Sequence, residues 1–149
     1  MSIFSIATSG LSAASLRVNV AASNIANIRT TGPLPASGGS GTSAGADSPS
    51  IGPTFPAAYV PLRVDQVSQS SGSTPGGTVA TVSAVSPSYI AQSDPGAPFA
   101  NEDGLVAAPN VDLASEFAEL ATAKYSFIAN AKVIQAYAET EDTLLDIKT

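Results

Sequence analysis

The feature that most constrains the fold is a heptad repeat of apolar residues at each end of the chain. In about residues 3–29 these positions alternate in steps of three and four: Phe4, Ala7, Leu11, Ala14, Val18, Ala21, Ile25 and Ile28. The same steps recur in about residues 111–147, with one polar interruption at Lys124: Leu113, Phe117, Leu120, Lys124, Phe127, Ala131, Ile134 and Ala138. This alternation forms one stripe of an α-helix and is typical of paired helices. We therefore predict a mainly α fold whose long N- and C-terminal helices pair as a coiled coil.

Each predicted helix also carries apolar residues outside its seam. In the first helix they are Ile6, Ala13, Leu16 and Val20, and in the second they are Tyr125, Ile128, Tyr137 and Leu144. A two-helix coil needs only one apolar stripe per helix. The helices can therefore be the core of an ordinary helical domain, or they can also pack against neighbouring molecules. The second stripes favour the latter interpretation.

The residues between the helices divide into two parts. Residues 30–58 are almost all Gly, Ser, Pro, Thr and Ala, which predicts a flexible low-complexity segment. In residues 59–110 we predict a small β and loop element, with strands near 58–64 and 78–85 joined as a hairpin through 70–77. Residues 93–111 are dense in turn formers and are predicted to be an ordered loop. The predicted organisation is thus an N-terminal axial helix (1–29), the flexible segment (30–58), the β element (59–110) and a C-terminal axial helix (111–149).

The charges and missing residue types exclude several classes of function. The chain carries a formal charge of −6, and its six cations are scattered rather than gathered in a basic stripe, so nucleic-acid binding is not expected. It contains no His and no Cys, which removes most transition-metal and thiol chemistry. No apolar run is long enough for a membrane span. We expect no cofactor, no metal and no catalytic residue.

The acidic residues Asp94, Glu102, Asp103 and Asp112 invite a calcium or hydrolase interpretation. An EF-hand loop with Gly104 at its sixth position would need an acidic residue at position 99 and a Glu at position 110. The chain has Phe99 and Asn110 at these positions, so the loop does not match. The paired carboxylates have no accompanying motif for glycoside hydrolysis. We interpret these acids as turn formers and helix caps, with Asp112 or Ser115 capping the second helix.

Two asparagines, Asn24 and Asn27, lie near the end of the first predicted helix. An amide that is half buried beside an apolar seam lowers stability but fixes the register of helix pairing, because a slipped pairing leaves it unsatisfied. The alternative is that both are solvated polar positions. The register interpretation predicts that Asn24→Leu stabilises an isolated helix pair and impairs the assembled protein.

The segment "SGLSAASLRVNVAASNIANIRTTG" (9–32) resembles the N-terminal signature of bacterial flagellar axial proteins, the family of rod and hook subunits. The matching positions are Ser9, Gly10, Leu11, Arg17, Asn19, Asn24, Asn27, Thr31 and Gly32. "ANAKVIQA" (129–136) resembles the second signature of this family through Asn130, Lys132, Ile134 and Gln135. The loop 94–113 resembles that of FlgC-type proximal rod proteins through Asp94, Pro95, Gly104, Pro109, Asn110 and Val111.

This resemblance implies a structural subunit of the flagellar basal-body rod, with the matched residues at assembly interfaces. It implies helical assembly with copies of itself and other rod subunits into a torque-transmitting shaft that crosses the periplasm. It also implies export through the flagellar type III apparatus without a cleaved signal peptide. The alternative from another class is a secreted, non-enzymatic binding or stalk module.

Overall fold

The computed structural model describes residues 2–35, 55–70 and 76–147, which fall into two compact units. One unit comprises residues 1–25, Leu62–Ala84 and Asp112–Thr149, and the other comprises Ala26–Pro61 and Val85–Val111. Most of the low-complexity segment lies outside the described residues, as does most of the predicted hairpin turn.

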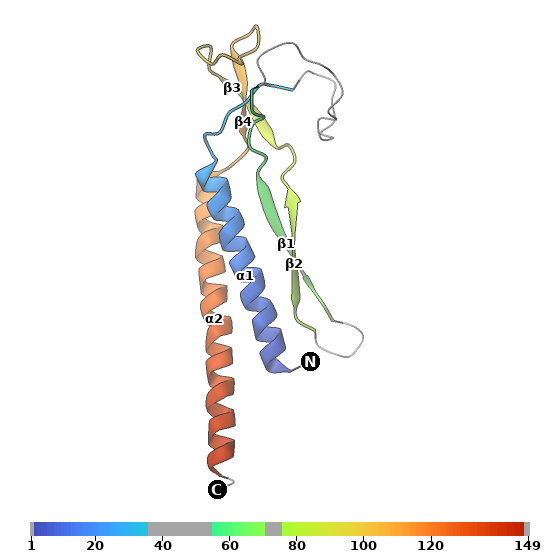
Figure 1. Ribbon diagram of the computed structural model, residues 1–149, viewed down its shortest axis with the longest axis vertical. Coiled ribbons are helices and arrows are strands. Elements are labelled where there is room, and N and C mark those ends of the chain that lie inside the picture. The colour runs from blue at the N-terminus through green and yellow to red at the C-terminus, as the bar shows by residue number, and fades with distance from the viewer. Residues whose placement is uncertain (1, 36–54, 71–75, 148–149) are drawn as a thin grey trace. The chain divides into compact units, whose positions relative to one another are not determined.

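The first unit contains two long helices and a hairpin (Figure 1). Helix α1 spans Ile3–Ala26 and helix α2 spans Leu113–Asp146. Strands β1 (Leu62–Ser68) and β2 (Thr78–Ala84) form an antiparallel pair. Helix α1 contacts α2 on one side and the hairpin on the other. The prediction of a mainly α chain with long terminal helices is confirmed.

Both predicted helices are present, and their ends differ slightly from the prediction. Helix α1 ends three residues early, in a turn where Thr30 N donates to the Asn27 carbonyl oxygen at 2.9 Å. Asp112 caps the start of α2, since its side chain accepts a hydrogen bond from Ala114 N at 3.1 Å. Of the two candidates for this cap, Asp112 is therefore the one used.

The buried contacts of the helix pair are made by small residues. The buried apolar residues of α1 include three of its predicted seam positions, Ala7, Ala14 and Ala21, and in α2 the buried apolar residue is Ala123. Alanines at a seam allow the two backbones to approach closely. Three of the eight predicted seam positions of α1 are therefore buried.

The predicted seam of α2 is wrong in part. Three of its large residues, Leu113, Phe117 and Phe127, are exposed, whereas Ala123 is fully buried. The covered stripe runs through positions 116, 120, 123, 126, 130, 134 and 137, so it shares Leu120 and Ile134 with the predicted seam and is displaced from it at the other positions. The heptad pattern of α2 therefore belongs largely to a face that the chain itself leaves uncovered.

The predicted hairpin is confirmed, with its first strand displaced toward the C-terminus. The register pairs Leu62 with Ala84 and Ser68 with Thr78. The first strand was expected over 58–64, but Pro61 precedes it. Proline has no N–H to donate to a ladder, which explains a strand that starts just after it.

The second unit contains a hairpin that the sequence prediction missed. Strands β3 (Tyr89–Ser93) and β4 (Leu105–Pro109) pair antiparallel, and Gly32 forms an isolated bridge with Ala107 of β4. The expectation that 93–111 is a loop is therefore wrong for its last strand. Residues 106–109 are buried, but "LVAAP" lacks the alternation of apolar and polar residues that signals a strand.

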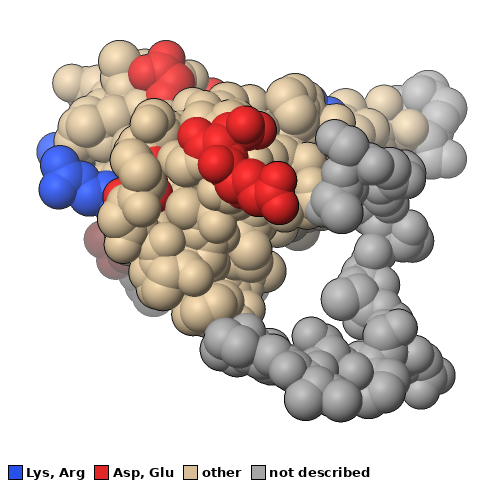
Figure 2. Space-filling view, turned by 90° about the horizontal axis from the view of Figure 1, so that it is seen from above, with Lys and Arg blue, Asp and Glu red and all other residues tan. Residues whose placement is uncertain are grey.

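Neither helix among the described residues combines the length and hydrophobicity needed to cross a membrane. In the view of Figure 2, uncharged residues cover most of the surface and acidic side chains are more prominent than basic ones. This distribution agrees with the negative charge of the chain.

Candidate functional site

Asn24 is the polar centre of the first unit. It is 1 % exposed, and its amide contacts two other elements. Its Nδ2 donates to the Leu62 carbonyl oxygen and to Glu116 Oε1, each at 2.7 Å, while its Oδ1 accepts from Leu62 N at 3.1 Å. One side chain thus joins α1, β1 and α2. The interpretation of Asn24 as a solvated position is wrong.

The contacts of Asn24 also reverse one sequence-based expectation. Leucine at position 24 could satisfy neither the N–H nor the carbonyl of Leu62, and it would leave the Glu116 carboxylate without its amide donor. Buried groups that lose their partners are costly. Asn24→Leu should therefore destabilise the helix pair rather than stabilise it.

Ser9 fixes the opposite end of the hairpin to α1. Its Oγ accepts a hydrogen bond from Thr78 N at 3.0 Å and donates to the Ile6 carbonyl oxygen at 2.7 Å. A Cβ added at Gly77 would overlap this hydroxyl, so glycine allows the close approach. Ser9 therefore joins β2 to α1, as Asn24 joins β1 to α1.

The spacing of these two contacts matches the length of the hairpin. Ser9 and Asn24 are fifteen residues apart on a helix, which is about 22 Å. The Leu62–Ala84 and Ser68–Thr78 pairs are six residues apart on extended strands, which is about 20 Å. Gln69 N donates to Gly77 O, so the neighbouring pair Ser68–Thr78 is a non-hydrogen-bonded pair. Because the two kinds of pair alternate along the ladder, Leu62–Ala84 is also a non-hydrogen-bonded pair. Both signature residues thus satisfy outward-pointing backbone groups at the ends of the hairpin.

The second apolar line of α1 lies on the face that packs on this hairpin. Ala13 is buried, and Ile6 and Val20 are partly buried. Ser9 and Asn24, which contact the hairpin, lie three or four residues from members of this line and share its face. We expected this line to favour a neighbouring molecule, but part of it is covered by the chain's own hairpin.

The two helices come close together at Gly10. A Cβ added there would lie 2.5 Å from Asn130 Oδ1. Asn130 donates from Nδ2 to the Ser126 carbonyl oxygen at 2.8 Å, which holds its amide against α2. Gly10 and Asn130, from the two predicted signatures, therefore meet in the structure.

An ion pair and a half-buried carboxylate lie on the same helix interface. Arg17 pairs with Glu119, and its Nε lies 3.1 Å from Glu119 Oε2. Burial raises the pKa of Glu116 above its ordinary value, the Asn24 hydrogen bond lowers it, and the charges of Glu119 and Asp112 raise it further. The net effect on the pKa of Glu116 is upward, because burial outweighs the single hydrogen bond.

Other predicted site residues of the first unit lie farther from these contacts. Leu11 and Ile134 are partly buried, whereas Asn19, Lys132 and Gln135 are exposed. Lys132 Nζ donates to Gln135 Oε1 at 3.0 Å, and Gln135 Nε2 donates to Glu139 Oε1 at 2.8 Å. These two bonds form a ladder along the surface of α2.

The predicted site residues of the second unit shape its turns. Gly32 N donates to Ala107 O at 3.0 Å, and Asp94 N donates to Gly104 O at 2.9 Å. Gly104 has a φ of +71°, which glycine adopts without strain. Asn27 lies in the turn that follows α1, and Thr31 lies just after it. Pro95 lies in the turn after β3, and Pro109, Asn110 and Val111 lie at or just after the end of β4.

Asn110 and Asn101 are the two asparagines that organise those turns. Asn110 Nδ2 donates to Pro87 O at 2.9 Å. The Oδ1 of Asn101 accepts from Asp103 N at 3.0 Å and from Leu105 N at 2.7 Å. The role of Asn101 follows a general signal, because an Asn side chain commonly bonds to the backbone two residues ahead. The acids of this loop border a tight turn, as the turn-forming interpretation expects.

The outer face of α2 exposes several large apolar side chains. Its exposed large side chains include Leu113, Phe117, Tyr125, Phe127 and Ile128, and Phe117 is 56 % exposed. Scattered exposed apolar residues are ordinary, but a contiguous patch on one helix marks an interaction surface. Sequence reasoning placed Leu113, Phe117 and Phe127 in an internal seam, but it assigned Tyr125 and Ile128 to a second stripe that favours neighbouring molecules, and both are exposed.

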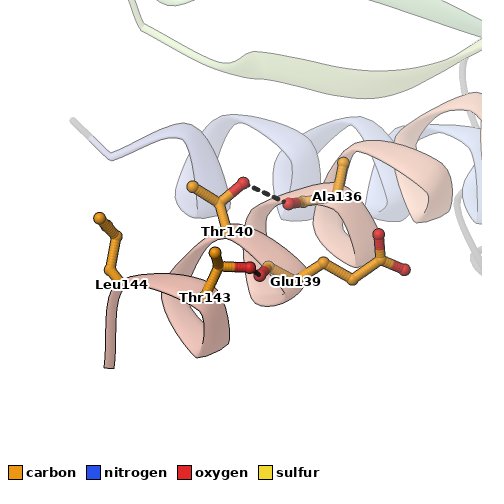
Figure 3. Close-up of a pocket in the computed structure, with 5 residues that line it drawn as sticks. All are labelled: Ala136, Glu139, Thr140, Thr143 and Leu144. Atoms are coloured by element: carbon orange, nitrogen blue, oxygen red, sulfur yellow. Dashed lines mark hydrogen bonds between the residues drawn. The ribbon is translucent and has the colours of Figure 1, made fainter. Parts of the chain in front are cut away.

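A shallow hollow lies farther along α2 (Figure 3). It is lined by Ala136, Glu139, Thr140, Thr143 and Leu144. The two threonine hydroxyls donate to carbonyl oxygens of their own helix four residues earlier, each at 2.8 Å. Among the residues described, no group of three or more Asp and Glu side chains could hold a metal ion. The hollow therefore offers one carboxylate and no enclosed ligand site.

Comparison with known proteins identifies the same two terminal regions. Residues 4–33 match the family described as flagella basal body rod protein, and residues 102–147 match the C-terminal family of flagellar basal body rod FlgEFG proteins. The flagellar basal-body rod proteins FlgC of Salmonella typhimurium and of Escherichia coli O157:H7 are each 34 % identical to the chain over 137 residues. Each alignment covers 90 % of this chain and 87 % of the relative.

These alignments extend over nearly the whole chain, through both helices and both hairpins. The matched family regions contain α1 with its Ser9, Gly10 and Asn24 contacts, and nearly all of α2 with Asn130. The chain therefore belongs to the family of FlgC-type flagellar basal-body rod proteins.

Proposed function

We propose that the chain, a structural subunit of the flagellar basal-body rod, assembles helically with copies of itself and with other rod subunits through its terminal helices. The assembled subunits form the part of the shaft that crosses the periplasm and transmits torque. The observation that carries this proposal is the uncovered apolar face of α2 in a member of the FlgC family. A rigid helix pair with one face free suits a heterologous contact that repeats without closing, which generates a helical assembly.

The proposal assigns two kinds of role to the predicted site residues. Ser9, Gly10, Arg17, Asn24 and Asn130 hold the helix pair and hairpin together, so that the outer face of α2 is presented in one conformation. The other predicted site residues contribute to contacts with neighbouring subunits, the exposed ones directly. Loss of either set should prevent rod assembly, and loss of the first set, or of the structural glycines Gly32 and Gly104, should also destabilise the single chain.

The proposal also includes the finer organisation expected from the sequence. The helices pair as a coiled coil, and residues 59–110 act as a β element between two axial helices. The subunit reaches the rod through the flagellar type III export apparatus without cleavage of a signal peptide.

The test is complementation of a strain in which the chromosomal copy of this gene is deleted. The wild-type chain should restore swimming. Phe117→Asp should not, because it places a charge on the apolar outer face, where Phe117 is 56 % exposed. Circular dichroism of the purified variant should remain that of the wild type, since Phe117 makes little contact within the chain.

The matched control is Ala118→Asp, which introduces the same charge one residue along, on another exposed face of α2. It should swim better than Phe117→Asp. Normal swimming and intact rods in the deletion strain would contradict the proposed function itself. Normal swimming of Phe117→Asp would contradict the role of the outer face.

A further inference from the structure

The β1–β2 hairpin is a two-stranded sheet among the described residues, so both of its edges face outward. In each non-hydrogen-bonded pair, the backbone N–H and carbonyl groups point away from the partner strand. Pairs of this kind alternate along the ladder from Ser68–Thr78 to Leu62–Ala84. The residues that point outward are therefore Leu62, Val64, Gln66 and Ser68 on β1, and Thr78, Ala80, Val82 and Ala84 on β2.

Helix α1 is anchored to one end of each edge. Asn24 bonds to both the N–H and the carbonyl of Leu62 at the start of β1. Ser9 accepts a hydrogen bond from Thr78 N at the start of β2. These two anchor points lie on opposite edges and at opposite ends of the hairpin. Helix α1 therefore crosses the hairpin diagonally and leaves the rest of each edge uncovered.

The remaining outward groups of the two strands are open. Among the described residues, no hydrogen bond from outside the hairpin reaches the backbone groups of two sets of three residues: Val64, Gln66 and Ser68 on β1, and Ala80, Val82 and Ala84 on β2. We call these sets the β1 edge and the β2 edge. Four of their members are exposed in the single chain: Gln66, Ser68, Val82 and Ala84.

The β2 edge lacks the features that usually keep an open edge unpaired. Natural sheets protect such edges with charged side chains, proline or a β-bulge. Strand β2, "TVATVSA", contains no charged residue and no proline, and its register with β1 runs without a bulge. Its valines and threonines favour extended structure. A strand of this kind is suited to accept another strand along its edge.

The geometry points to a β-ladder between copies of this chain, in which the β2 edge of one copy pairs antiparallel with the β1 edge of the next. This inference rests on the proposed rod function and adds a second contact to that of the outer face of α2. The two edges fit each other in one register. Its pairs, written with the residue of the next copy second, are Ala80–Ser68, Val82–Gln66 and Ala84–Val64.

This register is the one that uses every open residue of both edges. It leaves Leu62 and Thr78, which α1 already occupies, beyond the ends of the paired segment. A shift by two residues in one direction would place Ala84 opposite Leu62, whose backbone groups are bonded to Asn24. The opposite shift would leave Val64 beyond the end of β2. Relative to the pairing within the hairpin, the register displaces the next copy by two residues, about 7 Å.

A second copy is the occupant that the two edges favour. Because β1 and β2 are antiparallel within the hairpin, pairing β2 with the β1 of a neighbour leaves both copies pointing the same way. Each copy offers its β2 edge to one neighbour and its β1 edge to another, so the contact continues along the assembly and does not close. The ladder also places Val67, which is 63 % exposed, opposite Thr81 of a neighbour, and such pairs of β-branched residues stabilise sheets.

Disulfide cross-linking in assembled basal bodies tests the register directly. The chain has no cysteine, so two introduced cysteines report on one contact. Copies carrying Val67→Cys and copies carrying Thr81→Cys, distinguished by tags of different length, are expressed together in the deletion strain. These positions face each other as a non-hydrogen-bonded pair of the proposed ladder, in which side chains lie closest. Oxidation of isolated basal bodies should join the two kinds of copy.

The matched control replaces Val67→Cys by Arg63→Cys. Position 63 lies on the same face of β1 but four residues away, about 13 Å along the strand, which is too far for a disulfide. The combination of Arg63→Cys with Thr81→Cys should therefore give no cross-link.

Substitutions at Val82 provide a second readout. Val82→Pro removes an N–H that points out of the hairpin, so it should spare the β1–β2 ladder and abolish the cross-link between copies. The urea midpoint of the purified variant should stay close to that of the wild type. Val82→Lys places a protecting charge on the edge and should also reduce the cross-link. The control is Val60→Lys, at a valine outside the strands that is 47 % exposed against 43 % for Val82, and it should leave the cross-link unchanged.

The outcomes separate this inference from the proposed function. The inference is overturned if Val67→Cys and Thr81→Cys copies enter basal bodies without joining, or if Arg63→Cys joins equally well. A disulfide to a different flagellar protein would also overturn it, and each of these results leaves rod function intact. Failure of the wild-type chain to enter basal bodies would instead count against the proposed function.

Discussion

Replacing Asn24 by alanine should be the most destabilising single change at the helix interface. The substitution removes two hydrogen bonds to the backbone of Leu62 and one to the carboxylate of Glu116. The site is 1 % exposed, so solvent cannot easily replace the lost partners. The hairpin and α2 would both lose their polar connection to α1.

The magnitude follows from the three bonds. Neutral hydrogen bonds contribute about 1 kcal/mol each, a bond to a charged group contributes about 1.5–3 kcal/mol, and orphaned buried groups add to the loss. We expect Asn24→Ala to lower the free energy of unfolding by about 3–5 kcal/mol. This is a large fraction of the 5–15 kcal/mol that is typical of natural domains.

The assay is urea unfolding of the purified chain, followed by circular dichroism at the helix band. The midpoint should fall by about 2 M urea at an ordinary m-value. The control is Asn19→Ala, the same substitution at an exposed position of the same helix, which should change stability by less than about 0.5 kcal/mol. Equal effects of the two variants would refute the assignment of Asn24 as the polar centre.

Three further predictions concern other contacts. Gly10→Ala should lower the melting temperature despite the better helix propensity of alanine, because its Cβ meets the amide of Asn130. Adding Asn130→Ala should relieve the loss. Additive effects of the two substitutions would contradict this contact. Glu116→Gln keeps an acceptor for Asn24 but cannot ionise. Since the pKa of Glu116 is raised from the ordinary 4.5, its protonated form stabilises the fold, and that contribution disappears as the pH rises through the raised pKa. The wild type should therefore lose stability relative to Glu116→Gln as the pH rises from 4.5 through the raised pKa of Glu116, and parallel urea midpoints over that range would contradict this. Gly104→Ala should cost about 1 kcal/mol or more, measured by thermal melting, because Gly104 has a φ of +71° and its Cβ would lie 3.1 Å from Pro95 Cβ.

The long-range periodicity of the sequence predicted the helices and one hairpin well. Heptads sustained over many turns identify helices at both ends, and two β-rich runs around a Gly- and Ser-rich stretch identify β1 and β2. Strand β4 was missed because its "LVAAP" has no alternation, and its burial depends on tertiary pairing with β3 and Gly32. Local pattern contains no information about such partners.

The geometry of the candidate site could not be predicted from the sequence. A seam read from the sequence states which residues of α2 are apolar, but not whether the partner is α1 or another chain. Phe117 is an example, because it fits the heptad and yet faces away from α1. The sequence likewise indicated Asn24 as a register device, but the bonds to Leu62, 38 residues away, depend on the folded structure.

The measurement that tests the account most directly is a density map of isolated basal bodies from cells that express this chain. The account predicts that the α1–α2 pair lies within the rod wall, with Phe117 and Ile128 covered by neighbouring subunits. A rod that lacks this chain, or one in which the outer face of α2 is exposed to open solvent, would contradict it.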